Sequence, residues 1–462
     1  MRLRLIEPSS YQRDGTLLKS RWLFFPSLNL PYLAALAPED VQVAITVEQI
    51  EDVDLDEAVD LVGITAYTTQ ILRAYEIADR FRARGVPVVM GGIHVSMAPD
   101  EALDHADTVI VGEADETWPQ FLNDFRNGRP ARLYQAARRP PLVNLPRPKF
   151  SLLDRSRFLG YGRSRLYRLL GMPVYPVQTA RGCPNSCEFC SVTSFNGRAY
   201  RHRPVGEVIR EIESLGAATI FFTDDNLLGV RRRAVELLEA LAPLRLSWVG
   251  QAGIAAADDE DLIALAARSG CAELFLGIES LSASCLESVG KTVNRVDQYE
   301  RWLKVFADHG IGATASLMFG FDGDGPSVFR DAFEFLEHNR VAHSFWWPVT
   351  PFPGTVLYEK LRAEGRLKDD KWWLDRDLSA GFPDLKFSPA GMAEDLFTRE
   401  FRRCYRLYAS AGRTVRRALQ RPLRRCLWRL AYGVGAGRML RYGRLMAPGN
   451  GRPRTARSRG SP

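Results

Sequence analysis

The chain has 462 residues, of which 46% are hydrophobic and 25% are charged. This composition is that of an ordinary globular protein and excludes wholesale disorder and collagen-like repeats, and the length is enough for two or three domains. The formal net charge of +7 is unevenly distributed, because the segment from Phe401 to the C-terminus holds 17 Arg and no Lys, Asp or Glu. Residues 1–400 carry a net charge of −10, so the basic total does not by itself predict nucleic-acid binding.

The cysteine content and the length of the apolar runs indicate the cellular compartment in which the protein is expected. Seven Cys in so long a chain do not resemble a disulfide framework. The N-terminal residues lack the apolar stretch of a signal peptide. No run approaches the ~20 apolar residues of a membrane span. We therefore expect a cytoplasmic protein.

Short strands and helices alternate over the first part of the chain, which we expect to form one domain over residues 1–127. This alternation predicts a parallel sheet with helices on both faces. The expected strands are 2–6, 41–47, 60–66, 86–91 and 107–111, and the expected helices are 29–37, 70–84 and 115–126.

Three of these strands end in glycine-containing segments: Gly63-Ile-Thr-Ala-Tyr, Gly91-Gly92-Ile-His and Gly112-Glu-Ala-Asp. Parallel sheets bind ligands at the carboxyl ends of their strands, and glycine lets the backbone approach a ligand closely. None of the three segments has the GxGxxG pattern, so a dinucleotide is not indicated. Glycines that only shape turns are the alternative interpretation.

A proline-rich segment follows, and we expect residues 128–172 to connect two domains, since Pro disfavours helix. Next comes the most specific pattern in the chain, in which Arg181-Gly182 precedes Cys183, Cys187 and Cys190. Three thiolates within eight residues have the short spacing of iron–sulfur ligands. A [4Fe–4S] cluster held by three Cys keeps one iron open to another ligand.

Structural zinc is the alternative to a cluster. Zinc sites use four protein ligands, commonly as two Cys or His pairs. His202 offers a fourth ligand, but it has no partner for a second pair. The spacing therefore favours the iron–sulfur cluster.

The Cys-x3-Cys-x2-Cys motif, with Phe189 just before its third Cys, resembles the radical S-adenosylmethionine (radical SAM) superfamily. The preceding α/β domain, with Gly-Gly-Ile-His and Gly-Glu-Ala-Asp at strand ends, resembles the cobalamin-binding subfamily. The resemblance covers roughly residues 1–370 and implies a doubly wound, Rossmann-like cobalamin-binding domain. It implies that the following residues line a cobalamin pocket: Thr65, Gly91, Gly92, His94, Gly112 and Glu113. The Asp-x-His-x-x-Gly motif is missing, so we do not expect His94 to bind cobalt.

Strands and helices continue to alternate from residue 173 to residue 370 and make six βα units when the strand before Cys183 is included. Six units resemble the partial (β/α)6 barrel of the radical SAM superfamily rather than a closed barrel of eight. Polar residues follow several of the strands, where barrels place their chemistry. By resemblance, the residues expected to bind SAM are Phe189, Asp224, Asp225, Gln251 and Glu279. A helix cap or a solvated loop is the alternative for each acid.

The rest of the chain has no motif that indicates chemistry. We expect a helical, basic extension over residues 371–446 and a disordered tail over residues 447–462. The arginines of the extension alternate with apolar residues, which is typical of a helix that covers an acidic body or lies on a membrane surface. We do not expect it to bind nucleic acid, because no recognition module accompanies the charge.

Together, the resemblance implies an enzyme that cleaves SAM reductively at a [4Fe–4S] cluster and uses cobalamin to methylate an unactivated centre of a small molecule, either a natural product or a lipid. It also implies an electron donor such as flavodoxin or ferredoxin. One alternative is a cobalamin-binding radical SAM enzyme that catalyses cyclisation, oxidation or rearrangement. The alternative of another class is a non-catalytic iron–sulfur or zinc protein that binds nucleic acid through its basic tail.

Overall fold

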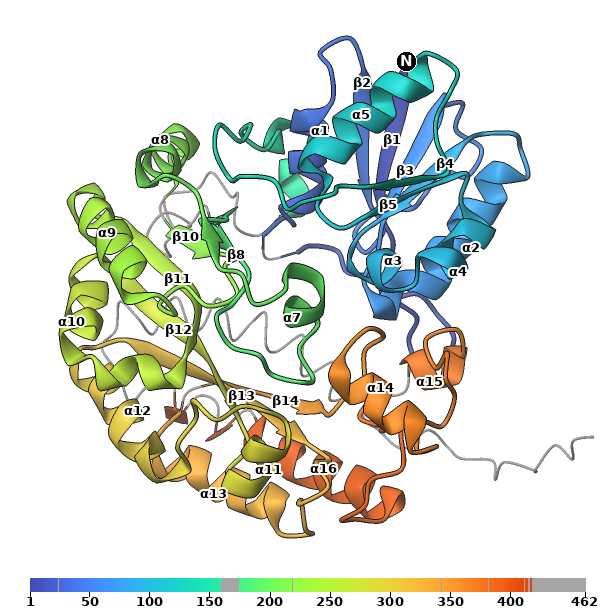
Figure 1. Cartoon of the computed structure of the whole chain (residues 1–462). Helices are drawn as coiled ribbons and strands as arrows, with labels where there is room; N and C mark the ends of the chain where they lie inside the picture. The colour runs from blue at the N-terminus through green and yellow to red at the C-terminus, as the bar shows by residue number, and fades with distance from the viewer. Residues whose placement is uncertain are drawn as a thin grey trace, which may run out of the picture.

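The computed structural model describes residues 1–158 and 174–410 apart from residues 24, 218, 342 and 381, together with residues 412, 413, 416 and 417. Two six-stranded parallel sheets dominate these residues (Figure 1). Most of the basic tail and the end of the predicted connector lie outside the described residues. In the part that is described, no helix is both long enough and apolar enough to cross a membrane.

The first sheet belongs to the N-terminal domain, and its strands have the order β2-β1-β3-β4-β5-β6. Its strands are β1 (Arg2–Glu7), β2 (Gln42–Val47), β3 (Leu61–Thr65), β4 (Val88–Gly91), β5 (Thr108–Val111) and β6 (Leu133–Gln135). The first five match the predicted strands. The sixth lies within the expected connector, where the sequence shows mainly prolines and arginines.

Helices cover both faces of this sheet, as the alternation predicted. They are α1 (Asn29–Leu36), α2 (Ile71–Arg82), α3 (Ile93–Met97), α4 (Pro99–His105) and α5 (Ala114–Arg126). The apolar residues of α1 and α5 pack with one face of the sheet, and those of α2 and α4 pack with the other. Strand order reverses at β1, between β2 and β3, and a sheet of this kind binds ligands beside that point.

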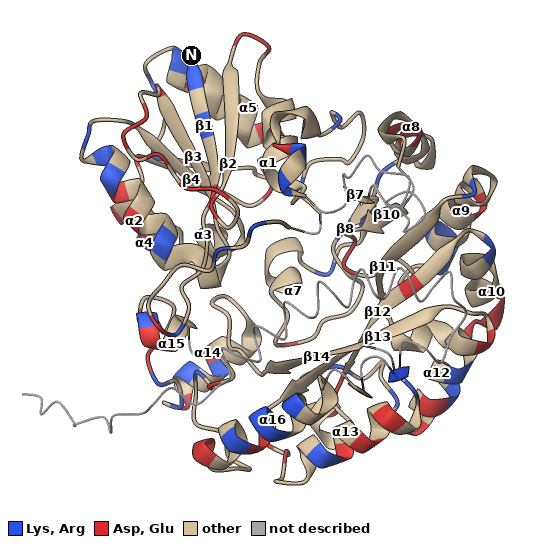
Figure 2. Ribbon diagram, turned by 180° about the vertical axis from the view of Figure 1, so that it is seen from behind, with Lys and Arg blue, Asp and Glu red and all other residues tan. Residues whose placement is uncertain are grey.

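The second sheet is the partial barrel, with the order β7-β10-β11-β12-β13-β14. Its strands are β7 (Val174–Val177), β10 (Thr219–Phe222), β11 (Ser247–Gly253), β12 (Cys271–Glu279), β13 (Gly312–Phe319) and β14 (His343–Pro348). Its outer helices are α8 (Val205–Leu215), α9 (Arg231–Leu241), α10 (Glu260–Arg268), α11 (Ala283–Ser288), α12 (Tyr299–Asp308) and α13 (Val328–His338). The six strands follow one another in chain order, as predicted. Charged residues lie mainly on the outer helices (Figure 2).

Three helices after the barrel complete the two domains. They are α14 (Val356–Ala363), α15 (Arg376–Ala380) and α16 (Glu394–Tyr408). Trp372 and Trp373, between α14 and α15, are buried in the apolar core of the N-terminal domain. Helix α16 lies beside α13 (Figure 1), and its Phe401 packs edge-on against Phe319 of β13. The first part of the basic extension is therefore integral to the barrel.

Candidate functional site

The three clustered cysteines lie on one loop at the carboxyl end of β7. The short strand β8 (Ala180–Arg181) pairs antiparallel with β9 (Arg201–His202) and fixes the start of the loop, and α7 (Ser191–Asn196) follows it. Gly182 lies between β8 and Cys183 and has φ +88°. A Cβ at this position would lie 2.1 Å from the carbonyl oxygen of Ala199. Only glycine fits this position, which explains the Arg-Gly before the first Cys.

Of the three cysteines, Cys187 is buried, and Cys183 and Cys190 are partly buried. Burial raises the pKa of Cys187 to about 11, and burial also raises the pKa of Cys190. A bound metal cluster reverses this preference, because its positive charge stabilises thiolate. Among the described residues, no three His, Cys, Asp or Glu side chains converge as ligands of a single metal ion. The thiolates that hold a cubane bind different iron atoms and do not need to converge in that way.

A buried ion pair faces the cysteine loop. Burial alone would lower the pKa of Lys291, but the carboxylate of Glu279 and the thiols of Cys187 and Cys190 raise it overall. Lys291 Nζ lies 3.5 Å from Glu279 Oε1. Glu279 ends β12 with φ +65°, a conformation that turns the chain away from the strand. The pair thus places one ammonium group beside the three thiols.

The two neighbouring acids after β10 have different surroundings. Asp224 is fully buried and accepts hydrogen bonds from the backbone N–H and the hydroxyl of Thr179, and burial raises its pKa to about 7. Asp225 accepts one hydrogen bond, from the Gly182 N–H at 3.2 Å, and lies on the wall of a cavity. Asp224 therefore braces the strand before the cysteine loop, while Asp225 is open to a ligand.

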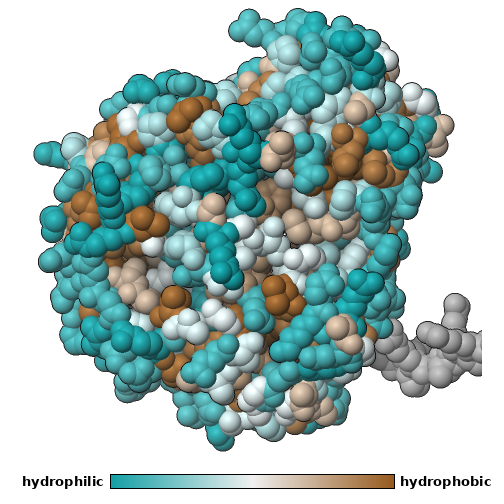
Figure 3. Space-filling model, viewed as in Figure 1, coloured by the Kyte–Doolittle hydropathy of each residue, from teal (hydrophilic) through white to brown (hydrophobic). Residues whose placement is uncertain are grey.

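This cavity has a volume of about 600 Å³ and lies between the N-terminal domain and the barrel. It starts at the carboxyl ends of β1 and β3, where the strand order reverses, and reaches Ser191, Val192 and Asp225 beside the cysteine loop. In Figure 3 the hollowed middle of this face is mostly of intermediate hydropathy, with apolar side chains in separate patches around it. Its size and mixed walls are those of a cofactor site.

Five of the six residues expected to line a cobalamin pocket are on the wall of this cavity: Thr65, Gly91, Gly92, Gly112 and Glu113. Gly92 has φ +104°, and a Cβ there would lie 2.8 Å from Thr65 Oγ1. Gly112 has φ +81° with nothing within 4 Å of a built Cβ. Both glycines are required by the backbone turns, and the second borders open space.

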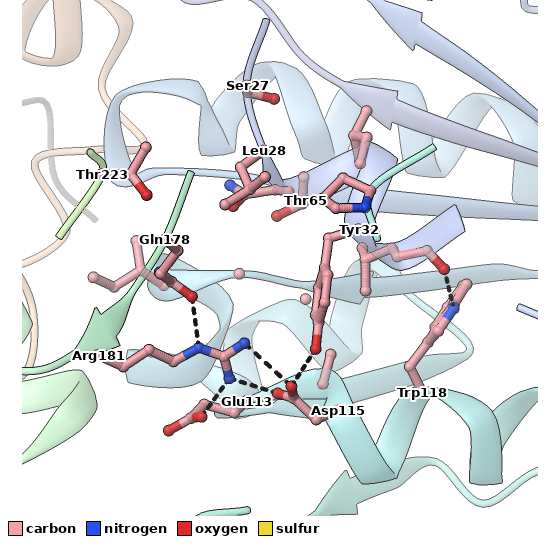
Figure 4. A pocket seen from close by; sticks show the side chains of 18 of the residues that line it. Ser27, Leu28, Tyr32, Thr65, Glu113, Asp115, Trp118, Gln178, Arg181 and Thr223 are labelled. Carbon is pink, nitrogen blue, oxygen red and sulfur yellow. Dashed lines mark hydrogen bonds and ion pairs between the residues drawn. The ribbon is translucent and has the colours of Figure 1, made fainter. Parts of the chain in front are cut away.

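Arg181 from the barrel side meets the acids Glu113 and Asp115 of the N-terminal domain at this cavity (Figure 4). Arg181 Nη1 lies 2.5 Å from Glu113 and 2.6 Å from Asp115, and Arg201 also pairs with Glu113. Tyr32 donates a hydrogen bond from its hydroxyl to Asp115. We call this set of Arg181, Arg201, Glu113 and Asp115 the arginine junction. It holds the two domains together along one wall of the cavity.

His94 does not lie among the residues that line either of the two cavities described here, contrary to expectation. Its ring is fully buried, with Nδ1 3.2 Å from Thr68 Oγ1 and Nε2 3.4 Å from Glu101 Oε1. Glu101 also accepts from Trp373 Nε1 at 3.0 Å and pairs with Lys371 at 3.1 Å. Gly92, with φ +104°, is the residue before α3, the helix that carries His94. We call His94, Glu101, Lys371 and Trp373 the Glu101 junction, which attaches the segment after the barrel to the N-terminal domain.

Of the two remaining residues expected to bind SAM, Phe189 lies on the cysteine loop itself and Gln251 lies elsewhere. Gln251 lines a second cavity inside the barrel. Phe189 is half-buried and packs against the main apolar core. The structure thus gathers Asp225 with the larger cavity and Glu279 with Lys291 at the cysteine loop, but it does not bring all five residues to one point.

Sequence reasoning missed three important participants: Lys291, Asp115 and the pairing role of Arg181. Lys291 lies on a loop with no motif around it. Asp115 is the last residue of the Gly-Glu-Ala-Asp segment and lies in the first turn of α5. An acidic residue at this position is a signal for a helix N-terminus. Arg181 was recognised only as part of the cysteine motif. The ion pair between Arg181 and Asp115 joins residues 66 positions apart, a separation that no local pattern reveals.

Comparison with known proteins gives two family matches and several close relatives. A family model for the B12 binding domain matches residues 18–122, and one for the radical SAM superfamily matches residues 177–336. The bacteriochlorophyllide d C-12(1)-methyltransferase of Chlorobaculum tepidum is 31% identical over 80% of this chain and 80% of its own length. The bacteriochlorophyllide d C-8(2)-methyltransferase of the same organism is 29% identical over 74% of this chain and 77% of its own length.

A solved structure shares the whole fold. It is the radical S-adenosylmethionine methyltransferase TsrM from Kitasatospora setae with cobalamin and a [4Fe-4S] cluster bound. The match has a TM-score of 0.66 at 17% identity and covers 96% of this chain and 99% of that one. The order of the two domains is therefore the same in both proteins.

Proposed function

The chain belongs to the family of cobalamin-binding radical SAM methyltransferases, and from this premise we propose which of its residues hold the cofactors and what each does. The enzyme uses a [4Fe–4S] cluster, SAM and cobalamin, and it methylates a small molecule. When bound, these groups supply a one-electron reductant, a carbon-centred radical and a transferable methyl group, while the chain supplies binding, orientation and exclusion of water.

We assign the cluster to Cys183, Cys187 and Cys190. This assignment is supported by their position on one loop that Gly182 anchors, and by the burial of Cys187. The Asn226 amide lies 3.8 Å from the sulfur of Cys183 and is suited to orient that ligand. Three Cys ligands would leave one iron of such a cluster without a protein ligand.

We assign SAM to the space between the cysteine loop and the larger cavity. Lys291 would pair with the carboxylate of SAM, since it is the ammonium group next to the thiols, and Glu279 holds it in place. Asp225 would accept hydrogen bonds from the amino group of SAM. Asp224 accepts hydrogen bonds from Thr179, and this contact keeps β7 and β10 in register beneath the cysteine loop.

We assign cobalamin to the larger cavity, with Thr65, Gly91, Gly92, Gly112 and Glu113 along the N-terminal side. The observation that carries this assignment is the open space at the strand ends, bordered by glycine backbone. The arginine junction closes the cavity on one side and keeps it at a fixed distance from the cysteine loop. His94 is not included, because its ring is engaged in the Glu101 junction.

The remaining partners are proposed on chemical grounds. The cluster needs a one-electron donor, and we propose a flavodoxin or ferredoxin. Three arginines just beyond α16, Arg413, Arg416 and Arg417, all pair with Glu337 of the barrel. These contacts support a role in covering the acidic body. We also propose a cytoplasmic location. We propose that contact with a membrane surface is made only by the part of the tail that follows Arg417.

The test is anaerobic reconstitution of the wild-type chain and a variant with Cys183, Cys187 and Cys190 changed to Ala. We expect about four iron atoms per wild-type chain, as in one [4Fe–4S] cluster, and cleavage of SAM, both lost in the variant. Cys404→Ala is the matched control, because its thiol is buried in the core away from the loop. One zinc and no iron in the wild type, or SAM cleavage by the triple variant, would overturn the assignment.

A further inference from the structure

The connector between the two domains carries an exposed strip of positive charge. Residues 128–150 contain no Asp or Glu, although residues 1–400 as a whole have a net charge of −10. All six basic side chains of this segment are exposed, and we call them the basic strip: Arg129, Arg132, Arg138, Arg139, Arg147 and Lys149. The strip therefore concentrates one sign of charge on the surface of an otherwise acidic body.

The charges of the basic strip are not neutralised within the protein. Among the described residues, which include every Asp and Glu of the chain, none forms an ion pair with these six side chains. Arg132 donates to the carbonyl oxygen of Leu103, and Arg139 donates to that of Phe195, but a carbonyl oxygen carries no full charge. The strip is therefore free to attract an acidic partner.

The composition of this segment favours a protein as that partner. Five of the six charges are arginines, and arginine is enriched at protein interfaces whereas lysine is depleted. Leu133 is 45% exposed and Val143 is 47% exposed, so the surface also offers apolar contacts. The two aromatic residues of the segment, Tyr134 and Phe150, are buried, so the strip gives nucleic-acid bases no surface for stacking.

The middle of the strip is held against both elements that flank the cysteine loop. Arg139 Nη2 donates to the carbonyl oxygen of Phe195 at 3.3 Å, and Phe195 belongs to α7, which begins directly after Cys190. Arg201 of β9 donates to the carbonyl oxygen of Pro140 at 2.8 Å, and β9 pairs with β8 just before the loop. These two contacts place the strip beside the loop to which the cluster is assigned.

The cysteine loop itself reaches the surface. Cys183 and Cys190 are only partly buried, and Pro184 between Cys183 and Cys187 is exposed. A partner that delivers an electron to this loop needs a docking surface beside it. The basic strip is such a surface, because its charge and its apolar side chains lie next to the loop.

We propose that the basic strip is the docking surface of a small acidic electron-carrier protein, which contacts the connector and passes one electron to the cluster. This inference rests on the proposed function, since it takes the cysteine loop as the place of the cluster. The carrier is oxidised and the cluster is reduced, and no covalent bond forms or breaks. Opposite charges raise the rate of such encounters by about 10- to 1000-fold and do so less at high salt.

The test compares two sources of electrons for the reconstituted holoenzyme. One is an acidic flavodoxin kept reduced by its reductase, and the other is dithionite, a small reductant that needs no docking surface. Arg138→Glu combined with Arg147→Glu reverses two charges of the strip whose side chains make no described hydrogen bond or ion pair. Arg80→Glu combined with Arg232→Glu is the matched control, because these exposed arginines lie on α2 and α9 and have no ion pair in the described part of the chain.

We expect the strip variant to bind flavodoxin at least about tenfold more weakly than the wild type in titration calorimetry. Its rate of SAM cleavage at limiting flavodoxin should fall by a similar factor, whereas its rate with dithionite should equal that of the wild type. Raising NaCl from about 0.01 M to about 1 M shortens the Debye length from about 30 Å to about 3 Å. This change should slow the flavodoxin reaction of the wild type toward that of the variant. The control double variant should match the wild type throughout.

Three results would overturn this inference while the wild type still cleaves SAM with dithionite. They are unchanged flavodoxin binding by the strip variant, an equal loss in the control double variant, and an equal loss of the dithionite rate in the strip variant. Weaker binding of the strip variant to anionic phospholipid vesicles, with unchanged flavodoxin binding, would assign the strip to a membrane instead. Absence of SAM cleavage with dithionite in the wild type would overturn the proposed function itself.

Discussion

Among the described residues, the arginine junction and the Glu101 junction both attach the N-terminal domain to the rest of the chain, and they differ in what they border. The arginine junction lies on the wall of the larger cavity, whereas the Glu101 junction lies away from it and holds the segment after the barrel. Both are built on acids that follow strands of the same sheet, near glycine-rich turns. Similar turns thus precede acids that border the cavity in one place and an acid that lies away from it in the other.

The largest effect is expected from Arg181→Met. This change leaves the buried carboxylate of Asp115 without its ion-pair partner and deprives Glu113 of one of its two, and breaking a buried pair costs about 3–5 kcal/mol. We expect urea unfolding to show that loss and the purified variant to retain less corrinoid. Arg126→Met is the matched control, since it breaks an exposed pair with Asp40 worth about 0–1 kcal/mol. Equal stability of the two variants would contradict the role of the arginine junction.

Glu101→Gln should have a smaller effect and should separate the two junctions. The variant weakens the hydrogen bonds from Trp373 and His94 and loses the ion pair with Lys371, with an expected cost of about 1–3 kcal/mol. Corrinoid content should stay at the wild-type level, because the junction does not border the cavity. A drop in corrinoid comparable to that of Arg181→Met would show that the two junctions act as one.

The Glu101 junction should also respond to acid. Burial alone would raise the pKa of Glu101, but hydrogen bonds from His94, Trp373, Lys371 and Tyr75 bring it down to about 2. Since the folded pKa is lower than the ordinary value of 4.5, this carboxylate contributes stability above pH 4.5 and loses it as the pH falls toward 2. The free energy of unfolding should fall less steeply over this range in Glu101→Gln than in the wild type. Parallel curves would contradict the assignment.

The smallest effect is expected at the contact of the tail with the barrel. Arg416 is 65% exposed where it pairs with Glu337, so Arg416→Ala should change the free energy of unfolding by no more than about 1 kcal/mol. Chemical denaturation measures this directly. A loss as large as that of Glu101→Gln would mean that the tail is a third structural junction.

Much of the fold was predictable, because parallel strands and outer helices follow from apolar alternation alone. The three-residue strand β6 was not, since it lies among prolines and pairs only at an edge. The site was predictable where a turn demands a particular residue, as at Gly182 and Gly92. It was not predictable where the direction of a side chain determines its role. Asp224 and Asp225 are neighbours, yet only Asp225 faces the cavity. Likewise Gly92 borders the larger cavity, whereas His94, two residues later, does not.

The measurement that tests the central claim most directly is the analysis of the chain purified anaerobically with cobalamin supplied and then incubated with SAM and reductant. We expect one corrinoid per chain, and both S-adenosylhomocysteine and 5′-deoxyadenosine as products. The first product forms when SAM gives up its methyl group, and the second forms when SAM is cleaved reductively. A chain that binds no corrinoid and forms 5′-deoxyadenosine alone would contradict the account.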